Sequence, residues 1–456
     1  MEKGHGQELK RALGPWAAAS IVVGTVIGSG IFLVPHDMVL RVGSGGMVLG
    51  VFVFGGLLSL AGALSYAELA AALPEAGAEY AYLREAYGPL WGFLYSWAQT
   101  WVGKGGSIAT LATGFFLYLA TFFPVLERPF YSAHLAVGTV EFRYGQLLAM
   151  VLILGLSGLN YFGVKLGGDV QIAITVVKVG LIIFVIIAGL LFGEARAATV
   201  PQVPGTFTAA GFFAALVAAL WAYDGWNNVA MVASEIRDPQ RNLPRALIGG
   251  TLAVIAIYLL VNAAYFRILT ASDVARSPRV AGEMMRRILG APGANLVAIA
   301  AMISIFAALN GSILTGSRVP YAAARDGYFF REIAFVHPKY RTPGVSILVL
   351  GAWSALLVLT GGYRQLFTYV MFASWIIYGM TTAGVLILRR TQPHLPRPYR
   401  TIGYPLVPVL FVVVSFLLVL YTAFDDPRDS AKGIVIIVLG LPFYFYWKRR
   451  KSQLEG

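Results

Sequence analysis

The chain has 456 residues, of which 58% are hydrophobic and only 12% are charged, and it carries a formal net charge of +13. Soluble domains carry about 25% charged residues, so this composition excludes an ordinary soluble protein and indicates a polytopic protein surrounded by lipid bilayer. In a soluble chain such a charge would suggest nucleic acid binding. Here the basic residues fall mostly between apolar stretches, as in the positive-inside topology of membrane proteins, and we expect no nucleic acid partner.

The sequence lacks the residues that disulfides and metal sites need. The absence of cysteine excludes a disulfide, a thiolate metal site and a covalent link to a partner through sulfur. The five histidines are scattered without the spacing of a metal site. The first apolar run is longer than the core of a signal peptide, so we expect an uncleaved first span. We expect neither a metal nor a cofactor.

Apolar stretches long enough to cross a bilayer recur along the whole chain and predict about twelve spans. They cover residues 12–40, 45–72, 89–124, 145–163, 167–193, 209–234, 243–267, 292–322, 344–361, 364–388, 404–424 and 431–447. We expect the connection 268–291 to hold a short amphipathic helix outside the membrane. With the N-terminus inside, most of the 35 Lys and Arg residues lie in inner segments, which predicts cytoplasmic N- and C-termini.

The first span contains GTVIGSGIF at residues 24–32, with glycines at positions 24, 28 and 30. Such glycines can serve close helix packing or mark a break in the helix. GSG is not a nucleotide-binding loop, because no strand precedes it and the rest of that fingerprint is missing. A second polar interruption, WAYDGWNN at residues 221–228, lies in the sixth span and favours the break, since broken helices at membrane depth need polar surroundings.

Two broken spans placed five spans apart are typical of transporters with inverted repeats, which bind substrate between the breaks near the midplane. We therefore predict an all-α polytopic membrane protein of 12 transmembrane helices, with a five-plus-five inverted repeat and broken helices 1 and 6. Residues 12–193 would form the first repeat and residues 209–388 the second. Residues 404–447 would add two C-terminal spans.

Several long motifs then make a family recognisable, in order along most of the chain. They are VGTVIGSGIFLVP (23–35), SLAGALSYAELAAALPEAGAEYAYLREAYGPLWGFLYSW (59–97), WVGKGGSIA (101–109), VQIAITVVKVG (170–180), LWAYDGWNNVAMVASEIRDPQRNLPRAL (220–247) and ALNGSILTGSRVPYAAARDG (308–327). The chain resembles the amino acid–polyamine–organocation (APC) superfamily, specifically its bacterial L-type amino acid transporters. The resemblance implies the LeuT-like fold and transport of α-amino acids by alternating access.

The motif positions for substrate recognition are Val26, Gly28, Ser29, Gly30, Ile31, Trp221, Asp224 and Asn227. The N–H groups that begin a half-helix after the first break suit the substrate carboxylate, and glycines there allow close approach. Freed carbonyls of Val26, Trp221 and Asp224 can accept hydrogen bonds from its ammonium. Trp221 matches the family's outer lid, although a packing role is the alternative. Asn227 can line the pocket, pack or cap.

Asp224 is a carboxylate inside an apolar run, which costs several kcal/mol at membrane depth. Three interpretations remain open: recognition of a cationic substrate side chain, capping of N–H groups near Trp226 and Asn227, or pairing with a membrane lysine. The family subgroup that handles dibasic and neutral amino acids also reads WAYDGW, so the resemblance includes cationic substrates. Other charged residues are expected on solvated faces or in inner-gate ion pairs, namely Glu68, Glu79, Glu85, Glu235, Arg237, Asp238 and Arg241.

Lys178 lies at the centre of the fifth span, too deep to snorkel to the surface. Sodium-coupled relatives hold a cation in this region, and the family match places the ammonium against Gly24, Ile27 and Ser304. A fixed charge there predicts sodium-independent transport. Lys178 is then either a tether between helices, a proton-carrying amine or a purely structural residue. Lys104 also matches a family lysine, with no assigned role.

The leading hypothesis is an amino acid exchanger of the bacterial inner membrane, with proton-coupled symport as the alternative. Its expected substrates are neutral α-amino acids and also cationic ones. A channel would need polar residues recurring along several spans, and a membrane enzyme would need a nucleophile–base pair or a metal cluster; neither pattern is present in the sequence. Animal relatives pair with a glycoprotein through a cysteine that this chain lacks, so we expect no disulfide-linked heavy chain.

Overall fold

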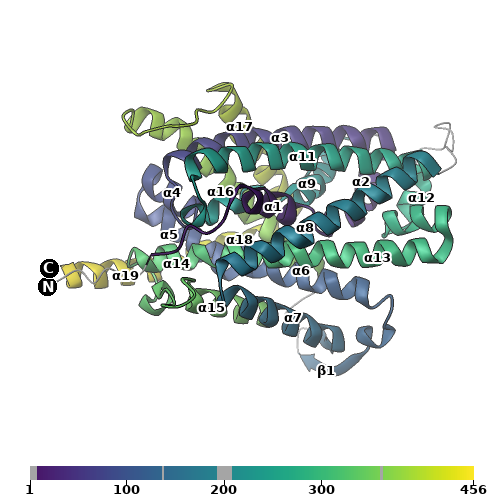
Figure 1. Ribbon diagram of the computed structural model, residues 1–456, viewed down its shortest axis with the longest axis horizontal. Coiled ribbons are helices and arrows are strands. Elements are labelled where there is room, and N and C mark those ends of the chain that lie inside the picture. Colours follow the sequence, from purple (N-terminus) through teal and green to yellow (C-terminus); the bar gives the residue numbers. More distant parts are fainter. Residues whose placement is uncertain (1–7, 136–137, 193–207, 360–362, 456) are drawn as a thin grey trace.

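The computed structural model describes residues 8–135, 138–192, 208–359 and 363–455, which are mostly helical (Figure 1). The α-helices are α1 (Pro15–Val26), α2 (Gly30–Val42), α3 (Gly45–Ala72), α4 (Glu79–Tyr87), α5 (Pro89–Ala98), α6 (Lys104–Leu119), α7 (Tyr144–Tyr161), α8 (Val164–Ile187), α9 (Ala209–Tyr223), α10 (Asn228–Met231), α11 (Pro239–Ile268), α12 (Ala271–Arg276), α13 (Val280–Gly316), α14 (Arg318–Arg325), α15 (Gly344–Leu357), α16 (Tyr363–Thr391), α17 (Leu406–Asp425), α18 (Pro427–Val438) and α19 (Gly440–Glu455). The π-helices are η1 (Gln99–Gly103) and η3 (Ala188–Phe192), and the 3-10 helices are η2 (Pro124–Glu127), η4 (Ala233–Glu235) and η5 (Arg331–Ala334).

Membrane-spanning character is confirmed for a large part of the bundle. Within the described residues, 8 helices are long and apolar enough to cross a membrane, and α9 and α15 are shorter apolar helices. The predicted second span, 45–72, coincides with α3. The chain is thus a multi-pass membrane protein of predominantly helical structure.

The helices pack in pairs of segments that are distant in sequence. α3 lies along α11, α6 along α13, and α2 along α9. Figure 1 shows α19, α14 and α4 toward one end of the bundle, and α12 and β1 toward the opposite end. The long helices therefore run between two ends that carry different connections, and the breaks of the first and sixth predicted spans meet inside the bundle.

Helix ends follow signals that are visible in the sequence. Ser44 accepts a hydrogen bond from the N–H of Met47 at the start of α3, and Thr208 does the same for Gly211 at the start of α9. Such side-chain caps satisfy N–H groups that lack intrahelical partners. Gly43, with φ 75°, separates α2 from α3, because a left-handed conformation favours glycine.

The connection 268–291 is helical, as predicted: it contains α12 and the first turns of α13, which is kinked at Gly290. Thr270 and Asp273 form a capping box at the start of α12. Hydrogen bonds from Arg287 hold the pKa of Asp273 well below its usual range. Arg287 therefore ties α12 to the first turns of α13.

A β-hairpin was not predicted from the sequence. β1 (Pro129–Leu135) pairs antiparallel with β2 (Gly138–Arg143), with Tyr131 opposite Phe142 and Leu135 opposite Gly138. This hairpin occupies the connection between the third and fourth predicted spans. The prediction counted only apolar stretches of membrane length, and a short two-stranded element between spans gives no such signal.

Candidate functional site

The first helix break lies between α1 and α2. α1 ends at Val26, and α2 begins at Gly30. Between them the N–H of Gly28 donates to the Val26 carbonyl at 2.8 Å, which is a tight turn rather than helix. The first turn of α2 directs its N–H groups into the break, and the positive end of the helix dipole favours an anion there.

The second break lies between α9 and α10. α9 ends at Tyr223, Asp224 is extended, and α10 begins at Asn228. Gly225 has φ +105°, a conformation that side-chain-bearing residues rarely adopt. The N–H of Asp224 donates to the Trp221 carbonyl at 3.0 Å, and the N–H of Asn228 to the Gly225 carbonyl at 3.1 Å. The predicted interruption of both helices is therefore present.

Two hydroxyl groups connect the breaks. The Thr25 hydroxyl donates to the Gly225 carbonyl at 2.9 Å. The Tyr258 hydroxyl on α11 lies 3.0 Å from the Val26 carbonyl and 2.8 Å from the Ala222 carbonyl. Because a hydroxyl has one proton to donate, it serves one of these carbonyls at a time. Neither residue was predicted as part of the site: Thr25 lies in the GTVIGSGIF segment but was not singled out, and Tyr258 lies in an uninterrupted apolar run.

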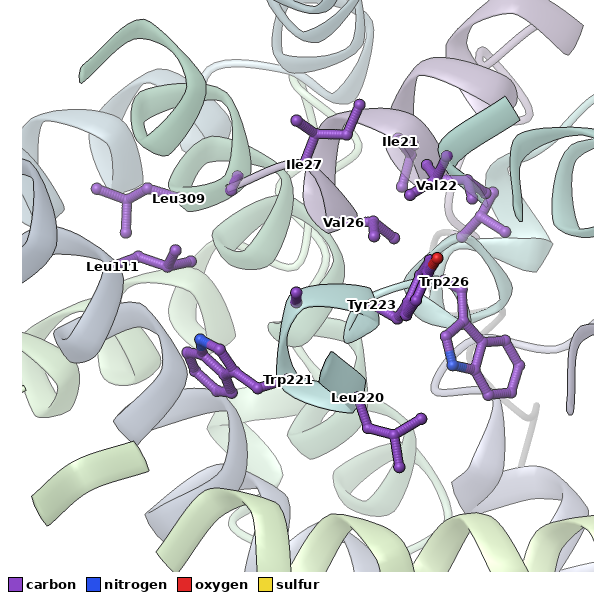
Figure 2. Close-up of a cluster of buried hydrophobic side chains, with 14 of the residues drawn as sticks. Ile21, Val22, Val26, Ile27, Leu111, Leu220, Trp221, Tyr223, Trp226 and Leu309 are labelled. Carbon is purple, nitrogen blue, oxygen red and sulfur yellow. The ribbon is translucent and has the colours of Figure 1, made fainter. Parts of the chain in front are cut away.

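A cavity of about 30 Å³ lies between the breaks. Its lining comprises Thr25, Val26, Gly28, Ser29, Gly30, Ser107, Leu111, Trp221, Asp224, Gly225, Asn228 and Ser312. Six of the eight predicted substrate residues are among them. Trp221 is 8% exposed, and Figure 2 shows its indole on the side of Leu111, whereas Trp226 points the opposite way. A space of this size holds about one water molecule.

The other two predicted substrate residues lie outside the cavity lining. Asn227 donates from its side-chain amide to the carboxylate of Glu79. Ile31 is fully buried, and its carbonyl accepts a 3.4 Å hydrogen bond from the Tyr265 hydroxyl. Both residues therefore pack behind the residues that line the cavity.

The glycines of the first break differ in what requires them. A Cβ at Gly30 would lie 2.8 Å from the Cα of Ala222, whereas at Gly28 it would meet Ala308 and Leu111 at an ordinary 3.5 Å. Gly30 is thus required by the close approach of α2 and α9. Packing does not require a glycine at position 28, so we attribute Gly28 to the close approach of a ligand to the backbone.

Asp224 is partly buried and lines the cavity. Its carboxylate accepts a 2.7 Å hydrogen bond from the Tyr378 hydroxyl on α16. The ammonium of Lys104, at the start of α6, also acts electrostatically on it, and it donates to the Asn228 side chain. The structure thus adds a tyrosine to the lysine pairing considered for Asp224.

Lys178 lies fully buried on α8. Its Nζ donates to the carbonyls of Gly24 and Ile27, both at 2.6 Å, and the Ser304 hydroxyl donates to Ile27 at 2.8 Å. The predicted cluster around Lys178 is therefore assembled from α1, α8 and α13. At Gly24 a Cβ would overlap the Gln171 side chain at 2.0 Å, so this glycine permits the close contact of α1 and α8.

The segment after the second break is fixed by backbone pairing. Leu13 exchanges hydrogen bonds with it, from its own N–H to Glu235 at 3.0 Å and from the Arg237 N–H at 2.9 Å. The N–H of Gly77 donates to the Met231 carbonyl at 2.9 Å. Among the charges expected on solvated faces or in gate pairs, Glu235 is completely buried and pairs with Arg318. This segment is therefore held by both backbone hydrogen bonds and a buried ion pair.

Glu79 was expected on a solvated face or in an inner-gate ion pair, and its position in the structure differs from the first of these. The sequence places it in a loop between spans, but the structure buries it completely at the start of α4. Its carboxylate accepts hydrogen bonds from Asn227 and, at 2.9 Å, from the Tyr95 hydroxyl. Its position in the long family motif 59–97 could have indicated a buried role, but a hydropathy profile does not detect such a motif.

Comparisons with known proteins match this chain along nearly its whole length. The family model for amino acid permeases matches residues 13–445. The human b(0,+)-type amino acid transporter 1 is 33% identical over 448 residues, covering 97% of this chain and 89% of the relative. The serine/threonine exchanger SteT of Bacillus subtilis (strain 168) is 33% identical over 448 residues, covering 98% of each.

A third relative, the mouse Asc-type amino acid transporter 1, is 30% identical over 451 residues, covering 97% of this chain and 82% of the relative. The family and these relatives are transporters, not enzymes. The resemblance drawn from the motifs is thereby confirmed. This chain belongs to the amino acid permease family, within the APC superfamily.

Proposed function

We propose that this protein transports α-amino acids across the bacterial inner membrane by alternating access, as a sodium-independent exchanger. The site between the two breaks supports it, because it offers helix N–H groups for a carboxylate and carbonyls for an ammonium around one cavity. Relatives named as an amino acid transporter and as a serine/threonine exchanger support the substrate class and the exchange mode.

The hydroxyl of Tyr258 provides a way to admit the substrate ammonium. The Val26 carbonyl accepts from Gly28 and lies within reach of Tyr258, which also reaches Ala222. When the hydroxyl donates to Ala222, the second lone pair of the Val26 carbonyl is available to the ammonium. The cavity of about 30 Å³ has no room for an amino acid side chain, so substrate entry requires Trp221 to move away from Leu111.

The observation that carries sodium independence is the position of Lys178. Its ammonium binds two carbonyls next to the first break, where a cation would otherwise neutralise the freed backbone oxygens. Because the charge of Lys178 is covalently attached, no sodium ion is needed at these carbonyls. As a permanent tether, Lys178 fits an exchanger, whereas as a proton carrier it would fit proton symport.

The architecture proposed for this mechanism has twelve spans in two inverted repeats, residues 12–193 and 209–388, followed by residues 404–447. Both termini face the cytoplasm. The chain acts without a disulfide-linked heavy chain, because it has no cysteine, and it uses no cofactor.

Transport in proteoliposomes tests the proposal. Uptake of labelled alanine should be saturable, should rise with internal unlabelled alanine and should not change when sodium is replaced by potassium. Lys178→Ala should abolish uptake, and Lys165→Ala, which removes an exposed lysine near the start of the same helix, should not. Sodium-dependent uptake would contradict the role of Lys178. Uptake into empty vesicles driven by a pH gradient would instead establish proton symport.

A further inference from the structure

Three ionisable side chains lie close together at the cavity wall and behind it. Asp224 comes from the second break, Lys104 from the start of α6, and Glu79 from the start of α4. Glu79 is 0% exposed and Lys104 is 6% exposed. The carboxylates of Asp224 and Glu79 both act electrostatically on the Lys104 ammonium. One cation thus faces two carboxylates in surroundings of low polarity, where such interactions are strong.

Lys104 lies one helical turn from the cavity wall. Ser107 and Leu111, at three and seven residues from Lys104 on α6, both line the cavity, and this spacing places all three on one helix face. The π-helix η1 ends immediately before Lys104, and π segments are frequent at functional sites. The ammonium donates to Asn228, itself a cavity residue. Lys104 can therefore influence the cavity through Asn228, although it does not line the cavity itself.

Burial raises the pKa of Glu79, whereas the Lys104 ammonium and two hydrogen-bond donors act against that rise. Its oxygens accept from the Asn227 amide and the Tyr95 hydroxyl, and groups that donate to a carboxylate stabilise its ionised form. The other titratable groups facing it come from α3, α4, α6 and α16. They are Tyr66, Tyr82, Lys104 and Tyr378.

We propose that Glu79 and Lys104 determine specificity for the charge of the substrate side chain. Glu79 balances Lys104, and this leaves the negative charge of Asp224 available to a cationic side chain in the cavity. Neither residue touches the substrate; both act as positioning residues through Asn227, Asn228 and Asp224. The inference rests on the proposed function, because it assumes that amino acids occupy the cavity between the breaks.

Two single substitutions should shift specificity in opposite directions. Lys104→Met removes the cation, so the ratio of kcat/KM for arginine to that for alanine should rise about tenfold, which corresponds to about 1.4 kcal/mol. Glu79→Gln keeps the shape and leaves Lys104 to neutralise Asp224, so the same ratio should fall by a similar factor. Lys165→Met and Glu127→Gln, at exposed positions, are the matched controls and should leave the ratio unchanged.

The double variant Lys104→Met/Glu79→Gln keeps the test decisive if a single variant fails to fold. Removing both partners of a buried pair avoids the cost of one uncompensated charge, and the double variant should return the wild-type ratio. An equal loss of alanine and arginine transport in folded single variants would show a structural role and overturn the proposal. So would a double variant that remains shifted, or a wild type that transports alanine but no arginine. A wild type that transports neither substrate would overturn the proposed function itself.

Discussion

At the scale of single residues, the buried ion pair of Glu235 and Arg318 allows a direct test of stability. Both side chains are 0% exposed, and Arg318 Nε lies 2.7 Å from Glu235 Oε1. Arg318 also donates to Ser317 at 2.9 Å. Leu13 pairs with the backbone of Glu235, so the pair stabilises the segment that follows the second break.

Arg318→Met should destabilise the protein by about 3–5 kcal/mol, because it leaves the Glu235 carboxylate buried without its partner. Thermal unfolding of the purified protein in detergent should show a clear fall in Tm. Arg325→Met, at a side chain 46% exposed in the weak pair with Glu75, is the control and should change Tm little. A Tm equal to that of wild type in Arg318→Met would mean that the pair contributes no net stability.

The position of a residue was predictable from the sequence where the residue itself interrupts an apolar run. Lys178 and Asp224 are such interruptions. Lys178 donates to the Gly24 and Ile27 carbonyls, and Ser304 donates to the same Ile27 carbonyl, so the residues implied by the family motif lie together. Tyr258 was missed because a tyrosine in a membrane helix looks like ordinary packing. Its role depends on the two carbonyls that it reaches, and these lie 232 and 36 residues away in the sequence.

At the scale of elements, the contact between α2 and α9 is what brings the two breaks together. It depends on Gly30, where an added Cβ would lie 2.8 Å from the Cα of Ala222. Backbone at that distance cannot move aside as a flexible side chain would. The two half-helices must therefore separate if position 30 carries a side chain.

Gly30→Ala should reduce transport at least about tenfold, because a misplacement of about 1 Å can cost on the order of a hundredfold in an organised site. Size-exclusion profiles should remain those of a folded protein, and uptake of labelled alanine is the measurement. Gly158→Ala, on α7 with open space around the glycine, should behave as wild type. Normal uptake in Gly30→Ala would show that α2 and α9 tolerate separation.

The boundaries of an element could be predicted where they coincide with the ends of a long apolar stretch. α3 coincides with its predicted span, whereas α4 and the β-hairpin have neither the length nor the hydropathy that defines a span. The burial of α4 follows from its packing against α5 and α16. Such tertiary contacts leave no period in the local sequence, which is why Glu79 was expected on a solvated face or in an inner-gate ion pair.

At the scale of the whole molecule, span number and orientation follow from the alternation of the connections between two membrane sides. Twelve spans with an inner N-terminus place positions 8, 339 and 453 inside and positions 127 and 428 outside. All five residues are exposed: Glu8, Glu127, Lys339, Arg428 and Gln453. The chain has no cysteine, so a single introduced thiol is the sole target for a maleimide reagent.

Single cysteines at these five positions should label in alternation. In intact cells, a membrane-impermeant maleimide should label Glu127→Cys and Arg428→Cys, and should leave Glu8→Cys, Lys339→Cys and Gln453→Cys unlabelled until the membrane is permeabilised. Retained alanine uptake in each variant confirms that the fold is intact. Labelling of Lys339→Cys and Arg428→Cys from the same side would contradict three spans between them. A complete reversal of the pattern would keep the span count and place the basic connections outside, against the charge asymmetry that sets membrane orientation.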